Sequence, residues 1–113
     1  MHANGAPVDF GTHCSAIQEE GYTVFTDVLS EAEITAYRAA LQPWLDKDLC
    51  GRNVFEGTRS HRVYAMLAKN PIFAELVTHP LALTLAEHFL GESCLLSACL
   101  AIELMPGESA QPW

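Results

Sequence analysis

One stretch near the end of the sequence limits the fold more than any other. Residues 93–105 read SCLLSACLAIELM, an apolar run that predicts a strand buried on both faces or nearly so. A single long strand cannot form a sheet, because each of its edges needs a partner. A short candidate strand around Tyr22 and Val24 would complete only a two-stranded ribbon, which is marginally stable. We therefore expect more strands beyond residue 113 and interpret the chain as the front part of a larger sheet.

Helical patterns precede this strand. Ser30 and Glu33 form a capping box, and the apolar residues behind them recur at helical spacing. We predict a helix from about 31 to 47, bent or loosened near Pro43. Residues 16–20 predict a short helical turn before the candidate strand.

The middle of the chain predicts a loop and two shorter helices. Residues 48–61 contain two glycines and few apolar side chains, which is typical of a long loop. Residues 61–67 fit a strand or a helical turn equally well. Asn70-Pro71 and Thr78-His79-Pro80 are helix starts, and Gly91 is a helix end.

This order of elements predicts an α+β fold, with helices ahead of a sheet that has barely begun. Residues 1–15 are expected to be loose, and 16–113 to belong to one domain. Pro106-Gly107 predicts a turn after the long strand.

Composition narrows the classes of function. The chain has 113 residues, half of them hydrophobic, and a net charge of −8, so nucleic acid is a poor partner for it. No apolar run is long enough to cross a membrane. We expect a cytoplasmic protein with reduced thiols, because no two of its cysteines form a CxxC pair. The cysteines are Cys14, Cys50, Cys94 and Cys99.

Familiar catalytic and metal-binding spacings are missing. None of the five histidines stands in an HxH, HxD, HxxE or HExxH pattern, and no phosphate loop or nucleophile motif is present. The strongest candidates for binding a ligand are the basic and aromatic side chains between positions 52 and 69. Arginine forks suit carboxylate or phosphate ligands, although a solvated loop would have the same composition.

Three blocks of sequence carry a family resemblance over roughly residues 17–113. They are GYTVFTDVLSEAEITAYRAAL, GRNVFEGTRSHRVYAMLAKNPIFAELVTHPLALTLAEHFLG and LLSACLAIELMPGESAQPW. In their order and spacing they resemble the phytanoyl-CoA dioxygenase family, in particular bacterial members of unknown substrate.

The resemblance implies the first strands of a double-stranded β-helix, a jelly-roll barrel that this chain leaves incomplete. It also implies hydroxylation of a small molecule with Fe(II) and 2-oxoglutarate. In the family, a segment like Pro106-Gly107…Gln111-Pro112 runs into a His-x-Asp motif that supplies two of three iron ligands. No metal ligand is assigned in this chain, since those ligands are expected beyond Trp113. We therefore expect no cofactor binding and no turnover by the 113 residues alone.

The resemblance also implies a few contacts to 2-oxoglutarate. One falls near Leu100 on the long strand, where the side chain could equally be barrel core. Another falls among Arg59, Arg62 and Tyr64.

Two hypotheses remain open at this stage. The chain is either the N-terminal portion of such a hydroxylase, or a non-enzymatic module that recruits a partner along the exposed edge of strand 93–105. The substrate and the oligomeric state do not follow from the sequence.

Overall fold

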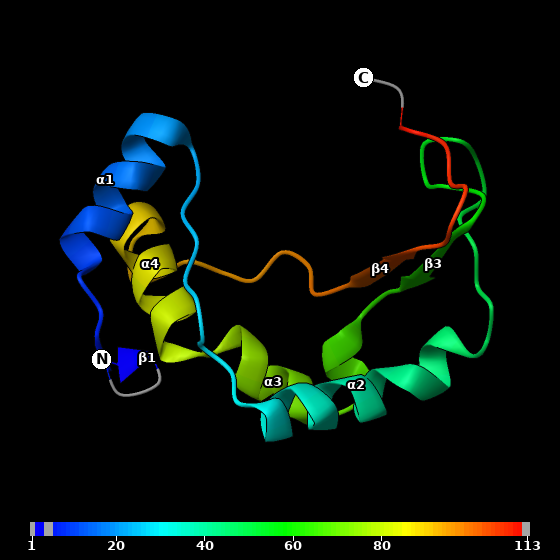
Figure 1. Ribbon diagram of the computed structural model, residues 1–113, viewed down its shortest axis with the longest axis horizontal. Helices are drawn as coiled ribbons and strands as arrows, with labels where there is room; N and C mark the ends of the chain where they lie inside the picture. Colours follow the sequence, from blue (N-terminus) through cyan, green and yellow to red (C-terminus); the bar gives the residue numbers. More distant parts are fainter. Residues whose placement is uncertain (1, 4–5, 112–113) are drawn as a thin grey trace. The chain divides into compact units, whose positions relative to one another are not determined.

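The computed structural model describes residues 2–3 and 6–111, and its elements confirm the α+β class (Figure 1). Within the described residues the helices are α1 (Phe10–Glu20), α2 (Glu31–Leu45), α3 (Ile72–Val77) and α4 (Pro80–Leu90), with a 3₁₀ turn at Met66–Ala68. The strands are β1 (His2–Ala3), β2 (Ala6–Pro7), β3 (Ser60–Val63) and β4 (Ala101–Leu104). None of the described helices combines the length and the apolar character that a membrane span requires.

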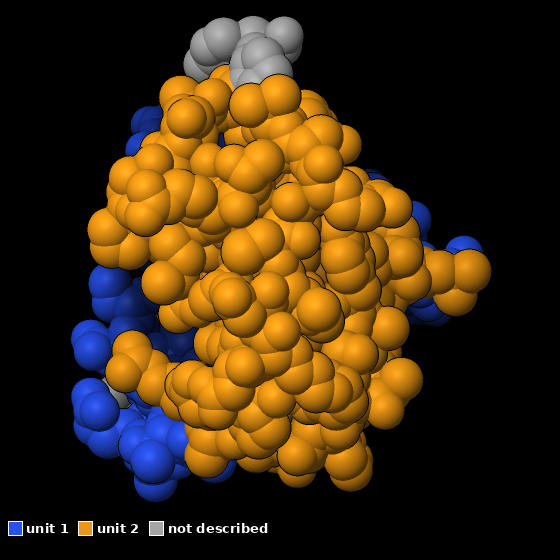
Figure 2. Space-filling model, turned by 90° about the vertical axis from the view of Figure 1, so that its right-hand side faces the viewer, with its two compact units in different colours: residues 1–36, 78–94 blue, residues 37–77, 95–113 orange. Residues whose placement is uncertain are grey.

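The chain divides into two compact units, coloured separately in Figure 2. Unit 1 comprises residues 1–36 and 78–94, and unit 2 comprises residues 37–77 and 95–113. Antiparallel pairing joins β1 to β2 in unit 1 and β3 to β4 in unit 2, and no larger sheet or barrel forms among the described residues.

Helix α1 is longer than the predicted turn at 16–20 and begins at Phe10. The carboxylate of Asp9 accepts hydrogen bonds from the backbone N–H groups of Gly11 and Thr12, which supplies the cap that the sequence reading overlooked. The strand predicted around Tyr22 and Val24 is wrong. Those residues are irregular, unpaired and about two-thirds exposed, because no neighbouring strand lies beside them in the described chain.

Helix α2 begins as predicted. The Glu33 carboxylate accepts from the Ser30 backbone N–H at 2.7 Å, and the Ser30 hydroxyl accepts from the Glu33 N–H at 3.3 Å. This reciprocal pair is a complete capping box. The helix continues past Pro43 for only two residues and ends at Leu45.

The two short helices also start where the sequence indicated. The Asn70 side chain accepts from the N–H of Ile72 at 3.0 Å, and the His79 Nδ1 accepts from the N–H of Leu81 at 3.3 Å. Gly91 follows α4 with a φ of 87°, a conformation that glycine adopts without steric cost.

The long strand is the largest correction to the predicted structure. Only Ala101–Leu104 of the predicted 93–105 is β4, and the segment before it is irregular. The strand is not buried on both faces either, since Ile102 is 46% exposed and Leu104 is 71% exposed. Its apolar side chains lack cover because β3 is the one strand paired with it among the described residues.

A small core holds unit 2 together. Val63, Met66 and Phe73 are buried, and Phe73 is 1% exposed. Side chains of α2, including Trp44, pack against this cluster, as do Cys99 and Ala101 from the segment that leads into β4. The core therefore fixes the β3–β4 pair against α2, and this pair carries the candidate sites.

Candidate functional site

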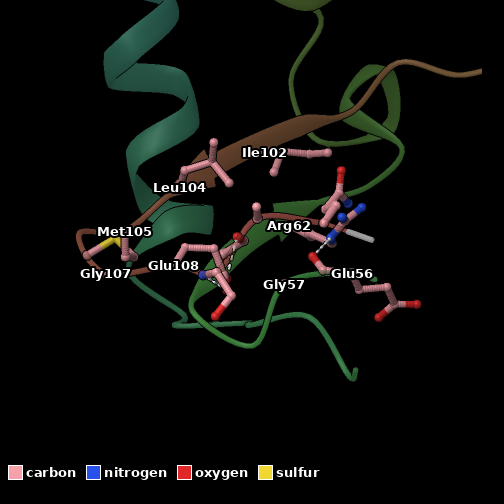
Figure 3. A pocket seen from close by; sticks show the side chains of 12 residues that line it. Glu56, Gly57, Arg62, Ile102, Leu104, Met105, Gly107 and Glu108 are labelled. Carbon is pink, nitrogen blue, oxygen red and sulfur yellow. Dashed lines mark hydrogen bonds between the residues drawn. The ribbon is translucent and has the colours of Figure 1, made fainter. Parts of the chain in front are cut away.

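A hollow lies in unit 2 beside the β3–β4 pair (Figure 3). Its volume is about 630 Å³. Ile102 and Leu104 of β4 form an apolar wall, Arg62 enters from β3, and Glu56 and Glu108 come from the two loops that flank the strands. The register of the two strands sets this arrangement, since Arg62 pairs with Ile102 and Ser60 with Leu104.

The first carboxylate of the hollow is held by Arg52. Glu56 accepts hydrogen bonds from the Arg52 backbone N–H at 2.8 Å and from its guanidinium at 3.0 and 2.6 Å. The Arg52 side chain first and its backbone N–H second lower the pKa of Glu56 from 4.5 to about 2. Arg62 approaches the same loop, because its Nε donates to the Glu56 carbonyl oxygen at 2.5 Å.

The second carboxylate anchors the turn that follows β4. Glu108 accepts from the Ser60 hydroxyl at 2.8 Å and from the Arg59 backbone N–H at 2.7 Å. The Ser60 bond first, then the backbone donors, lower the pKa of Glu108. Both carboxylates are thus ionised at neutral pH, and each has an arginine beside it, Arg52 beside Glu56 and Arg59 beside Glu108.

Replacing Arg52 with glutamine should raise the pKa of Glu56 from about 2 toward its ordinary value of 4.5. A carboxyl whose pKa is depressed in the folded state stabilises that state above about 4.5, and the contribution is lost as pH falls toward about 2. NMR titration of the glutamate side chains measures the shift. The variant Arg38→Gln, which alters an exposed arginine of α2, is the control and should leave Glu56 unchanged. An unchanged pKa in Arg52→Gln would show that the ion pair is absent in solution.

The four residues suggested for 2-oxoglutarate contact lie in different places. Arg62 lines the hollow just described, whereas Tyr64 and Leu100 line a second hollow of about 380 Å³ in the same unit. The Arg59 guanidinium lies against Gly107, where an added Cβ would come within 2.9 Å of its Nη1. The chain by itself therefore does not gather the four into one site, and their role stays a prediction.

A separate cluster combines Asp48, Cys50 and His61. The His61 Nε2 lies 2.7 Å from an Asp48 carboxylate oxygen, and the Cys50 sulfur lies 3.7 Å from the same oxygen. On the other side of the ring, Nδ1 lies 2.9 Å from Glu103. The bonds to Glu103 and then to Asp48 raise the pKa of His61. Sequence reasoning missed this cluster because Cys50 and His61 stand at the two ends of a loop, outside any standard ligand spacing.

The iron site of a 2-oxoglutarate-dependent oxygenase requires two histidines and one carboxylate on one face of the metal. Over residues 2–3 and 6–111, the cluster of Asp48, Cys50 and His61 is the single group of three possible metal ligands, and it contains one histidine and a cysteine. The described residues do not fit that iron. The end of the Pro106…Trp113 approach sequence, Pro112-Trp113, lies outside the described residues.

Comparison with known proteins adds one finding. The sequence model of the family described as phytanoyl-CoA dioxygenase (PhyH) matches residues 17–113. No curated protein and no solved structure gives a significant match to the chain.

Proposed function

Because the chain belongs to the phytanoyl-CoA dioxygenase (PhyH) family, we propose that it forms the front portion of an Fe(II)- and 2-oxoglutarate-dependent hydroxylase of a small molecule. Family membership relates the chain to this oxygenase chemistry and to small-molecule substrates. The proposal adds that these 113 residues contribute the helices and opening strands of the catalytic domain, and that the iron ligands come from elsewhere. In this view the chain alone is inactive.

The observation that carries this proposal is the incomplete cover of β4. Its apolar side chains Ile102 and Leu104 are exposed, and one of its edges has no strand beside it among the described residues. An apolar strand with an open edge is stabilised when further strands pair with it and a second sheet packs on it. A jelly-roll barrel would supply both, and its further strands would carry the iron ligands.

Anaerobic titration with Fe(II) and 2-oxoglutarate tests the proposal. The 113-residue chain should show no visible charge-transfer band of the ternary complex, because residues 2–3 and 6–111 do not bring two histidines and a carboxylate together. The same chain, extended through the codons that follow Trp113 in its gene, should show the band. The readout is this band and not metal binding as such, so a cation held at another position does not count. A band from the 113 residues, or downstream codons without His-x-Asp, would refute the proposal.

The open edge of β4 also supports the second hypothesis, a non-enzymatic module that binds a partner by strand addition. Urea unfolding and size-exclusion chromatography of the 113-residue chain, together with the titration above, separate the two. A stable, cooperatively unfolding monomer with no iron-binding extension would favour the module.

A further inference from the structure

Cys50, His61 and Glu103 form a row across three adjacent backbone segments of unit 2. The backbones of Cys50 and His61 form an isolated antiparallel β-bridge. His61 also pairs with Glu103 in the register of β3 and β4. Side chains directly opposite one another in a sheet project from the same face. The backbone therefore places a thiol, an imidazole and a carboxylate side by side, and it does so independently of the hollow described above.

The imidazole of His61 is oriented by this row. The Glu103 and Asp48 carboxylates can only accept hydrogen bonds, so Nδ1 donates to Glu103 at 2.9 Å and Nε2 donates to Asp48 at 2.7 Å while no ion is bound. Nε2 then faces Asp48 and Cys50. A carboxylate behind a histidine, with the other nitrogen facing further donors, is the arrangement that orients histidine ligands in metal sites.

Three possible metal-ligand atoms in this cluster are close enough to bind one ion. The Nε2 of His61, the sulfur of Cys50 and a carboxylate oxygen of Asp48 all lie within 4.8 Å of one another. Ligands bound tetrahedrally to zinc at about 2.0–2.3 Å stand about 3.3–3.8 Å apart. The 3.7 Å separation of sulfur and carboxylate oxygen already matches, and a small side-chain rotation would open the 2.7 Å contact between His61 and Asp48.

The donor set also indicates the class of cation. Mixed sulfur, nitrogen and oxygen donors suit Zn²⁺ and similar divalent transition metals, whereas Mg²⁺ and Ca²⁺ prefer oxygen alone. The side chain of Asp48 is 82% exposed, so an ion has free access from solvent, and water can complete the coordination. The ring of His61 is only 13% exposed, which fixes one ligand in place before the ion arrives.

We propose that Asp48, Cys50 and His61 bind one divalent transition-metal ion of the zinc type, with Glu103 as the residue that positions His61. This site is distinct from the iron site of the family, because it lies wholly within the 113 residues and uses a cysteine. On binding, the Cys50 thiol and the Nε2 of His61 each release a proton to solvent, and the thiolate and the imidazole nitrogen coordinate the ion while Nδ1 keeps its proton toward Glu103.

Titration of the reduced chain with Co(II) tests the site, since a cobalt–thiolate bond gives a near-ultraviolet charge-transfer band. We expect the band to saturate at one equivalent and to disappear when Zn²⁺ displaces the cobalt. Cys50→Ser should abolish the band, and Cys94→Ser, which changes a cysteine outside the cluster, should retain it. A band that survives Cys50→Ser, is lost in Cys94→Ser or never saturates would overturn the proposal.

Two further variants separate ligand from positioning roles. Asp48 has a φ of 52°, and asparagine tolerates this left-handed conformation, so Asp48→Asn removes the charge while keeping the backbone. It should weaken Co(II) binding. Glu103→Gln should leave the cobalt–thiolate band in place but weaken affinity about 10- to 100-fold, as loss of a residue behind a metal ligand does. Unchanged affinity in both variants, with native circular dichroism, would contradict the assigned roles.

Discussion

Replacing Phe73 with alanine should lower the free energy of unfolding by about 3–5 kcal/mol. Phe73 is 1% exposed and belongs to a core with just two other buried members in its cluster, Val63 and Met66. So small a core has few neighbours that can collapse into the space left behind. Because domains of this size are stable by only about 5–15 kcal/mol, the variant should lose a large share of its stability. Urea denaturation followed by circular dichroism measures the change.

The matched control is Phe55→Ala. This substitution removes the same number of atoms, but Phe55 is 65% exposed in the loop before β3. Its replacement should therefore lower the free energy of unfolding by well under 1 kcal/mol. Equal midpoints for the two variants would show that Phe73 is not the centre of the core in solution.

Replacing Gly51 with alanine should also destabilise the chain, by about 1–3 kcal/mol. An added Cβ would meet the carbonyl oxygen of Gly57 and stand 2.6 Å from the carbonyl group of Glu56, both of them backbone atoms. The backbone N–H of Gly51 donates to the carbonyl oxygens of Gly57 and Ser60, each at 3.0 Å. The loop therefore cannot open to make room for the Cβ without losing these hydrogen bonds. Thermal or urea unfolding gives the magnitude.

Gly11→Ala serves as the control for this change. There the added Cβ would lie 3.4 Å from the Asp9 side chain, at the start of helix α1, where alanine is a better helix former than glycine. We expect this variant to be neutral or slightly stabilising. A Gly51→Ala protein as stable as Gly11→Ala would mean that the loop over residues 51–57 is not closely packed.

The features that sequence reasoning predicted correctly are local. The capping box of Ser30 and Glu33, the Asn70 cap and the helix end at Gly91 each involve residues within a few positions of one another. Their hydrogen bonds depend on short-range geometry, which a sequence pattern specifies.

The features that it predicted wrongly depend on distant partners. A strand exists only where another strand pairs with it, and neither Tyr22 nor most of 93–105 has such a neighbour among the described residues. For residues 93–105, apolar composition alone indicated burial, although much of this segment is exposed. Propensity for a strand is largely propensity to pack on a half-buried surface, and that surface must be supplied from elsewhere.

The candidate sites also depend on contacts between distant residues, which the sequence pattern did not reveal. Arg62 and Tyr64 are two apart and would share a face if β3 continued, but the strand ends at Val63 and Ala65 adopts a left-handed φ of 51°. Arg62 and Tyr64 line different hollows. The cluster of Cys50 and His61 needed the register of β3 with the preceding segment, which no spacing in the sequence encodes.

The open edge of β4 has a consequence for the behaviour of the isolated chain at high concentration. Exposed apolar residues on a strand with a free edge favour edge-to-edge association between copies. The net charge of −8 opposes this association by mutual repulsion, and Glu103 places one of those charges on the strand itself. Salt screens such repulsion over about 10 Å at 0.1 M ionic strength. Raising the ionic strength therefore weakens the repulsion that keeps copies of this chain apart.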